Sequence, residues 1–338
     1  MTAETNVLVT GGAGYIGSHA VLALLDAGKR PVVIDNLVTG FRWAIPENVT
    51  FYEGNVADAD LVARIIREER IDAIMHFAGS IIVPESVENP LKYYGNNTAA
   101  SRSLIESVLT NGVRHFIFSS TAATYGIPES SPVREDMPTL PINPYGMSKL
   151  MVERILSDFD KAHGIRSIPL RYFNAAGADR DGKTGERHAC ETHVIPLALK
   201  GAYDEGYEFT ILGSDFDTPD GTAIRDYIHV EDLAEAHLRA LNALEHGAAS
   251  AAYNLGTGRG TSVAEVVAAV ERATNRKIPR RYGPRRPGDP GRLIALPDKA
   301  KRELGWVASR SGIDNIIRTA LAWHEVDWAH DHAEHAAS

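Results

Sequence analysis

The sequence predicts an α/β protein built on a doubly wound parallel sheet, with a smaller α/β domain toward the C-terminus. Along the first half of the chain, short apolar and β-branched segments alternate with segments of helical periodicity. This order of elements gives a parallel sheet with crossover helices on both faces. The expected strands are 6–10, 31–34, 49–53, 73–77, 115–119 and 167–171. The helices expected between them include 18–27, 58–69 and 96–110.

The pattern changes after residue 174, where a Gly-rich polar loop begins. We assign 1–174 to the sheet domain and expect 226–256 to return to it, because a strong helical segment and an apolar strand follow one another there. The smaller domain is expected to comprise 175–225 and 257–330. Later elements are expected to be helices at 230–246, 262–274 and 313–324, a basic loop at 280–292, and a disordered Ala- and His-rich tail at 331–338.

The composition excludes several classes of protein. The chain has 338 residues and a net charge of −9, so we expect no nucleic-acid partner, because such binding needs a basic face. No apolar run approaches the roughly 18 residues that cross a bilayer, and no signal peptide precedes the first strand, so we expect no membrane segment. Cys190 is the single cysteine, which excludes an internal disulfide and favours a reducing, cytoplasmic location.

A glycine-rich turn joins the first strand to the first helix. Gly11, Gly14 and Gly17 (in GGAGYIG) permit a tight turn and close backbone approach, and the following helix offers free N–H groups to a pyrophosphate. Such a loop alone could equally be an ordinary turn. The next strand ends in Asp35, near the distance at which a Rossmann-type dinucleotide site has an acid for the adenosine ribose hydroxyls. Because Asp35 repels a 2′-phosphate, NAD is favoured over NADP, although Arg42 nearby argues the other way.

Polar and small residues follow several of the expected strands where each strand ends. Ligands of doubly wound sheets bind at the carboxyl ends of the strands, so these residues are candidates for one shared site. They are Asn55, Phe77, Ala78, Gly79, Thr121, Phe173 and Asn174. Taken singly, each can be an ordinary loop cap, and for Asn55 that explanation is preferred. The whole set at one edge indicates a binding site.

The residues best suited to chemistry lie between Thr121 and Lys149. If Pro144 opens a helix, Tyr145 and Lys149 are four residues apart and lie on one face of it. A phenol acts as a base near neutral pH only when its phenolate is stabilised, and we expect the Lys149 ammonium to do this by Coulomb attraction. The alternative is a helix that carries an aromatic residue and a lysine by chance.

Motifs along nearly the whole chain resemble those of the UDP-glucose 4-epimerase family, within the extended short-chain dehydrogenase/reductase superfamily. In the family's order they are TGGAGYIGSH at the start, HFAG at 76–79, YYGNN at 93–97, FSSTAATYG at 118–126, NPYGMSKLMVE at 143–153, RYFNAAGA at 171–178, ETHVIP at 191–196, DGTAIRDYIHVEDLA at 220–234, YNLGTG at 253–258 and RRPGD at 285–289. The resemblance implies that NAD+ takes a hydride from C4 of a UDP-hexose and returns it to the other face of the 4-keto sugar.

The resemblance also implies roles for single residues. Tyr145 matches the family's base, Lys149 its partner on the nicotinamide ribose, and Thr121 the hydroxyl that bonds the sugar 4-oxygen. The implied cofactor residues are Gly11, Gly14, Tyr15, Ile16, Gly17, Asp35, Asn36, Asn55, Val56, Phe77, Ala78, Gly79, Asn96, Tyr145, Lys149 and Phe173. The implied substrate residues are Thr121, Tyr145, Asn174, His193, Val194, Arg225, Arg286, Asp289 and Leu293. His193 is interpreted as a hydrogen-bond donor to the substrate, and no metal site is expected.

Departures from the family pattern refine this expectation. Ala122 and Ala123 stand where related 4,6-dehydratases carry an acidic pair, so elimination of water is disfavoured and simple oxidation and return remains. Asn55 stands where many members have Asp, a change that keeps a hydrogen-bonding side chain at the adenine. Ile81 stands where many have Lys, which removes one cofactor contact. Leu293 aligns with a position that limits the sugar pocket, and its medium size leads us to hypothesise UDP-GlcNAc as a second substrate.

Two other functions stay open at this point. The chain could be a 4-epimerase of another nucleotide sugar, such as a UDP-pentose or a UDP-uronic acid. It could also be an NAD-binding regulator without catalysis, which predicts a broken Tyr–Lys pair that this sequence does not show. The closely spaced histidines of the tail are interpreted as part of a disordered segment and not as metal ligands.

A homodimer is implied by the resemblance, through helices near 97–110 and 145–162 that pair across a two-fold axis. The apolar residues of these helices can serve either an interface or the core of the chain. They include Leu104, Ile105, Leu150, Met151 and Ile155.

Overall fold

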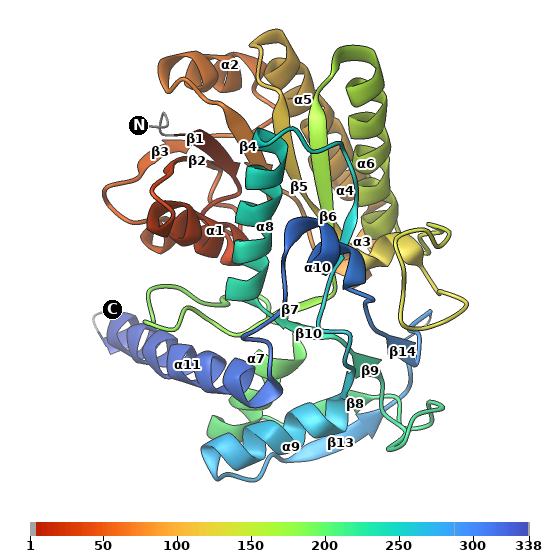
Figure 1. Cartoon of the computed structure of the whole chain (residues 1–338). Coiled ribbons are helices and arrows are strands. Elements are labelled where there is room, and N and C mark those ends of the chain that lie inside the picture. The colour runs from red at the N-terminus through yellow and green to blue at the C-terminus, as the bar shows by residue number, and fades with distance from the viewer. Residues whose placement is uncertain (1–4, 287, 337–338) are drawn as a thin grey trace.

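A computed structural model of the chain describes residues 5–286 and 288–336, with side chains as far as residue 327. Its centre is a seven-stranded sheet whose neighbouring strands all run parallel (Figure 1). Across the sheet the strands are β11 (Tyr253–Leu255), β6 (Arg166–Tyr172), β5 (His115–Thr121), β4 (Ala73–His76), β1 (Asn6–Thr10), β2 (Arg30–Asp35) and β3 (Thr50–Glu53). The prediction of a doubly wound parallel sheet is confirmed.

Helices cover both faces of the sheet because successive strand residues point to opposite sides. In β1, Val7 and Val9 belong to one buried cluster, and Leu8 belongs to another. The first cluster packs under α1 (Tyr15–Asp26) and α8 (Val230–Glu245). The second packs under α2 (Ala59–Glu68), α5 (Ala100–Thr110) and α6 (Pro144–His163). The strands are therefore apolar on both sides, as a sheet between two helical layers requires.

The order of the strands reverses between β1 and β4. From β1 the chain builds outward through β2 to β3, then crosses back to β4 on the other side of β1 and builds outward again. The connections that leave the carboxyl ends of β1 and β4 therefore part in opposite directions. A doubly wound sheet binds its ligand at such a switch point.

The smaller part of the molecule has its own buried cluster. It lies among α7 (Val194–Tyr203), α9 (Val263–Thr274), the first turns of α11 (Ile313–Ala336) and strand β8 (Phe209–Leu212). Short sheets complete this part and comprise β8 with β13 (Arg280–Gly283), β7 (Asn174–Ala176) with β10 (Tyr227–His229), and β9 (Ile224–Arg225) between β12 (Thr261–Ser262) and β14 (Arg292–Leu293).

The two parts interleave in sequence. The segment 226–256 adds α8 and β11 to the sheet part. A second return, which the sequence analysis missed, is α10 (Asp298–Leu304) and the buried Trp306 that follows it. Trp306 belongs to the cluster under α8, and its Nε1 donates to the Asp232 carbonyl at 2.8 Å. Burial of this large ring holds residues 298–306 against the sheet part and not with the smaller domain.

Several local expectations were wrong. The last helix does not end at His324, and the expected disordered tail is helical as far as Ala336, since no Gly or Pro interrupts this Ala-rich segment. Residues 337–338 lie outside the described part of the chain. The basic segment 280–292 is not a continuous loop, because it begins in β13 and ends in β14.

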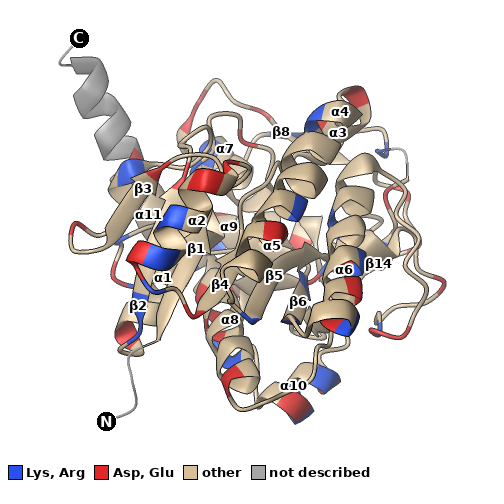
Figure 2. Ribbon diagram, turned by 90° about the horizontal axis from the view of Figure 1, so that it is seen from above, with Lys and Arg blue, Asp and Glu red and all other residues tan. Residues whose placement is uncertain are grey.

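Acidic and basic side chains are interspersed over the outer helices. Figure 2 shows both signs along α2, α5 and α6, in keeping with the modest net charge of −9. Within the described residues, no helix is long and apolar enough to cross a membrane.

Candidate active site

The turn after β1 brings backbone unusually close to backbone. Gly11 has a φ of +69°, and a Cβ at this position would lie only 2.5 Å from the amide nitrogen of Ala78, which follows β4. A Cβ at Gly17 would lie 2.2 Å from the Gly11 carbonyl oxygen. Gly14 is the N-cap of α1 and offers no side-chain cap, so the start of the helix is open to an anion. The turn fits the pyrophosphate of a dinucleotide.

Asp35 ties the ends of β1 and β2 together. Its carboxylate accepts from the amides of Ala13 at 3.0 Å and Leu37 at 2.8 Å, and burial raises its pKa. Arg42, which argued for a 2′-phosphate, donates to the Ile45 carbonyl at 3.0 Å and lies over the Phe51 ring. Asp35 therefore lies against the glycine turn at the end of β2, while Arg42 is engaged with Ile45 and Phe51.

The other expected cofactor residues differ in their surroundings. Tyr15 donates its phenol to the Gly177 carbonyl at 2.6 Å, which joins the glycine turn to the loop after β7. Asn55 accepts from the Ala57 amide at 2.9 Å, which is the loop-cap role considered for it. Asn96 is exposed and donates to the Ser80 hydroxyl at 3.2 Å. The remaining expected cofactor residues lie in the first turn of α1 or just after strands of the sheet. They are Ile16 in α1, Asn36 after β2, the buried Val56 after β3, Phe77 to Gly79 after β4, and Phe173 after β6.

Thr121 and Tyr145 lie together at the end of β5. Asn143 caps α6 by accepting from the Gly146 amide at 2.8 Å, and Pro144 fills the first helical position. This sets Tyr145 in the first turn, beside Thr121, the last residue of β5. Burial raises the pKa of the Tyr145 phenol, and a hydrogen bond with Thr121 opposes that rise.

The Lys149 ammonium has a different partner from the one expected. Its Nζ donates to the Ser119 carbonyl at 3.0 Å and lies 5.1 Å from the centroid of the Phe118 ring. Burial lowers its pKa from 10.5 to about 8. We expected this ammonium to stabilise the Tyr145 phenolate, but in the free protein the group that lowers the phenol's pKa is Thr121.

Asn97 is a buried site residue that the sequence analysis missed. Its Oδ1 accepts from the Ser80 amide at 2.7 Å, and its Nδ2 donates to the Ser80 carbonyl and the Ser148 hydroxyl, both at 3.0 Å. It lies in a π-helical turn, Tyr94–Ala99, where a continuous α-helix was expected. A Cβ at Gly79 would lie 2.9 Å from its Oδ1 and 3.5 Å from Lys149 Nζ. The YYGNN motif contained Asn97, but only the fold shows that this residue faces inward.

Most of the expected substrate residues lie on the short strands and the loops of the smaller part of the molecule. Arg225 forms an ion pair with Asp289, and Leu293 lies beside Arg225 in the β9–β14 pairing. The loop before β14 reaches the start of α6, since a Cβ at Gly288 would lie 2.9 Å from the Ile142 side chain. Asn174 opens β7, one residue after Phe173.

His193 is the N-cap of α7, and Val194 is the first residue of that helix. Burial lowers the pKa of His193, but Glu186 and Glu191 outweigh it and raise the pKa to about 9, with the positive charge of Arg286 opposing them. Arg286 and His193 are therefore close enough to interact. The two cationic groups suit a diphosphate on this side of the site.

The glycine turn generates a first prediction. Replacing Gly11 with Ala places a side chain at a positive φ and against the Ala78 backbone, so we expect the purified variant to lose most of its bound dinucleotide. Gly112→Ala is the matched control, because Gly112 has a φ of +81° but nothing within 4 Å of an added Cβ. Nucleotide released from both variants is measured by chromatography. A full complement in Gly11→Ala would refute the assigned role of the turn.

The buried ammonium of Lys149 generates a second prediction. Below about pH 8 Lys149 is charged in both the folded and the unfolded chain, and burying this charge opposes folding most there. Between pH 8 and 10.5 the folded chain releases the proton while the unfolded chain still holds it. The unfavourable effect on folding therefore disappears toward pH 10.5. We expect Lys149→Met to stabilise the nucleotide-free protein at neutral pH and to lose that advantage at alkaline pH. Urea unfolding at both pH values measures this. An advantage independent of pH would contradict it.

The chain was compared with known proteins and structures. Residues 7–256 match the NAD dependent epimerase/dehydratase family. A UDP-glucose 4-epimerase of Azospirillum brasilense is 53% identical over 321 residues, which cover 95% of this chain and 92% of that protein. The structure of UDP-glucose 4-epimerase from Brucella ovis in complex with NAD has a TM-score of 0.92 at 46% identity and covers 94% of this chain and 98% of its own. The structure of UDP-glucose 4-epimerase from Bifidobacterium longum in complex with NAD+ and UDP has a TM-score of 0.89 at 40% identity. The match covers 96% of this chain and 99% of that chain. The chain thus belongs to the NAD-dependent epimerase/dehydratase family.

Proposed function

We propose that this protein is an NAD-dependent 4-epimerase that interconverts UDP-glucose and UDP-galactose through a 4-keto intermediate. The observation that carries the proposal is the meeting of Thr121, Tyr145 and Lys149 at the carboxyl end of β5, on the same sheet edge as the glycine turn. The relatives named UDP-glucose 4-epimerase, at up to 53% identity over nearly the whole chain, support it.

Tyr145 is proposed as the base for the 4-hydroxyl of the sugar. Because burial raises its pKa, the phenol holds its proton in the free protein, and it becomes a base only when positive charge is brought next to it. With NAD+ bound, the nicotinamide ring would supply that charge and the acceptor for the hydride of C4. Tyr145 takes the proton of the 4-hydroxyl as the hydride leaves and returns it to the 4-oxygen when the hydride comes back. Thr121 holds that oxygen, and Lys149 holds the nicotinamide ribose.

The surroundings of Thr121 favour oxidation and return over elimination of water. Elimination needs a second acid or base beside the 4-keto sugar, and Ala122 and Ala123 supply neither. They form a short helical turn, Ala122–Tyr125, in which Thr121 caps the Ala123 amide at 3.1 Å. The phenol therefore works without a neighbouring carboxylate in this turn.

The nucleotide is proposed to bind on the smaller domain. Asn174, Arg225 and Arg286 take the pyrophosphate, His193 and Val194 add hydrogen bonds at the start of α7, and Asp289 takes the uridine ribose. Arg225 and Asp289 form an ion pair with each other, so UDP has to compete with this pair. Such a pair gives each of these half-buried charges a partner of opposite sign until the nucleotide arrives.

Related sugars remain secondary candidates. Leu293 lies half-buried beside Arg225, and its medium size supports UDP-GlcNAc as a second substrate. UDP-pentoses and UDP-uronic acids are tested with it in one panel. The intact Tyr145–Lys149 pair argues against a regulator without catalysis. With one cysteine, Cys190, the enzyme suits a reducing cytoplasm.

The first test measures the reaction and its base. The purified protein is expected to carry NAD and to interconvert UDP-glucose and UDP-galactose without added cofactor. Tyr145→Phe should keep the nucleotide and lose about 100-fold or more in kcat, because the base is removed and the ring is not. Tyr207→Phe is the control and should leave kcat unchanged, because Tyr207 lies between α7 and β8 with the centroid of its ring 4.9 Å from Lys200 Nζ. A nearly active Tyr145→Phe would rule out the assigned base.

A homodimer is proposed through α6 and the π-helical turn before α5. Five apolar residues were considered for either an interface or the core, and three of them, Leu104, Ile105 and Leu150, are buried in the chain itself and serve the core. Met151 is 39% exposed and, with Ile155, lines an apolar surface groove. The groove is completed by Tyr94, Thr98, Ala99 and Arg102. A second copy of this chain would cover it by the same pair of elements.

The interface is tested by adding a charge. Met151→Arg places a guanidinium in the groove, so light scattering should show a dimer for the unchanged protein and a monomer for this variant. Val307→Arg is the control, because Val307 is 54% exposed on another surface. A monomer for the unchanged protein, or a dimer that survives Met151→Arg, would refute the interface.

A further inference from the structure

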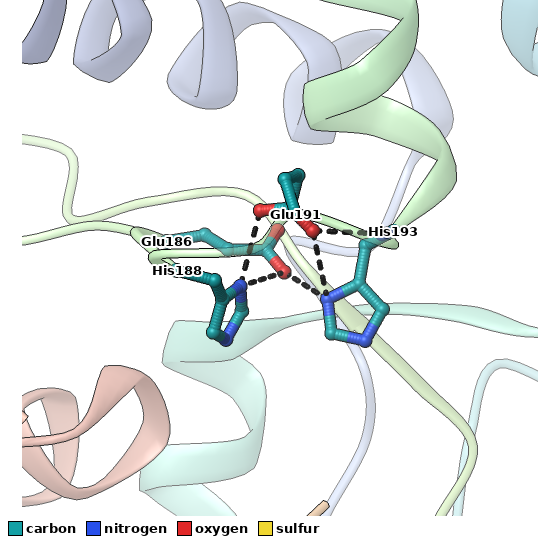
Figure 3. A group of neighbouring side chains, drawn as sticks. All are labelled: Glu186, His188, Glu191 and His193. Atoms are coloured by element: carbon teal, nitrogen blue, oxygen red, sulfur yellow. Dashed lines mark hydrogen bonds and ion pairs between the residues drawn. The ribbon is translucent and has the colours of Figure 1, made fainter. Parts of the chain in front are cut away.

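Four side chains that can bind a metal ion gather in the loop before α7. They are Glu186, His188, Glu191 and His193, all within eight residues of the chain (Figure 3). One nitrogen or oxygen atom from each lies within 4.8 Å of the others. His188 Nδ1 is 3.0 Å from a Glu191 oxygen and 3.7 Å from Glu186 Oε1, and His193 Nδ1 is 3.6 Å from Glu191 Oε1 and in contact with Glu186 Oε1.

We propose that this cluster, Glu186–His188–Glu191–His193, binds one divalent first-row transition metal ion, with zinc as the best match. Two imidazole nitrogens and two carboxylate oxygens form a four-ligand set that zinc accepts in tetrahedral geometry. With metal–ligand bonds of about 2.0–2.2 Å, the ligand atoms of such a site are about 3.3 Å apart. Three of the histidine–glutamate separations here, 3.0, 3.6 and 3.7 Å, lie close to that value. Magnesium and calcium prefer all-oxygen sites, which this is not.

The charges of the cluster also suit a dication. One dication, two neutral imidazoles and two carboxylates sum to a net charge of zero. A bound zinc ion therefore places no uncompensated charge in the loop.

The loop holds these ligands in place through contacts outside the cluster. Glu191 Oε1 accepts from the amides of Thr192 and His193, both at 2.7 Å, which orients the carboxylate. The Glu186 side chain is only 7% exposed, and its carbonyl accepts from Trp323 Nε1 at 3.1 Å. Gly185 lies against the same ring, because a Cβ there would be 2.2 Å from it. Such outer contacts fix ligand direction and raise affinity.

The metal site shares His193 with the proposed substrate site, but its test does not depend on the epimerase activity. We had interpreted His193 only as a substrate donor and expected no metal. In the structure its Nδ1 points into the cluster, so this atom serves the site with its three partners. Metal binding is measured without UDP-sugar, and the variants below avoid His193, so either proposal can fail without the other.

The test is a zinc titration of untagged, full-length protein. His330, His332 and His335 are replaced by Ala in every sample, so that the tail histidines do not contribute. After treatment with EDTA and dialysis, calorimetry should show one zinc ion per chain, and cobalt should give the visible absorption of a tetrahedral site. His188→Asn and Glu191→Gln should each weaken zinc binding at least about tenfold.

His163→Asn is the matched control, because this histidine is exposed at the end of α6 and should leave zinc binding unchanged. Circular dichroism and NAD content show whether each variant is folded. If either His188→Asn or Glu191→Gln does not fold, the other variant alone carries the test. Absence of stoichiometric zinc binding in the parent protein would overturn the proposal. Binding that survives both His188→Asn and Glu191→Gln would overturn it equally.

Discussion

The whole site depends on one close approach, that of the Gly11 backbone to Ala78 across the ends of β1 and β4. Because these two strands lie side by side while their connections part, the space above them is the one place where a ligand can meet backbone from both directions. A side chain at Gly11 would close that space. The position of α1, the Asp35 bridge between neighbouring turns and the Tyr15 bond to Gly177 all follow from the turn that this contact permits.

Burial determines the electrostatics on the other side of this space. It raises the pKa of Tyr145 and lowers that of Lys149 to about 8, so each charged form is less favoured than it would be in water. The ammonium is held by the Ser119 carbonyl and not by the phenol. In this arrangement the phenol is poised to act only when a cationic cofactor is present. This suits a reaction in which one proton leaves and returns within a closed site.

The sheet could be predicted from sequence because its signals are local. Apolar strands, helical periodicity and the glycine turn each occupy a short segment, and the four-residue spacing of Tyr145 and Lys149 is a property of any helix. The direction of the Lys149 side chain could not be predicted, since it depends on β5, which ends well before α6 begins. Asn97, Trp306 and the Glu186–His188–Glu191–His193 cluster were missed for the same reason: each acquires its role through packing or loop geometry that residue spacing does not show.

Periodicity alone could not decide where two outcomes share one pattern. Leu104, Ile105 and Leu150 have the spacing of an interface and of a core alike, and only their burial in the folded chain assigns them to the core. The segment after His324 has the composition of a tail and also that of a helix, and the absence of Gly and Pro favours the helix.

The most direct test of oxidation and return follows a label on C4 of the sugar. UDP-galactose with deuterium at C4 is converted by the purified protein in ordinary water, and the UDP-glucose formed is analysed by NMR and mass spectrometry. If the hydride is held within the site and returned to the other face, the product keeps its deuterium at C4. Loss of the label to water would contradict the account, because it would mean that C4 is inverted by removal of a proton and not by transfer of a hydride.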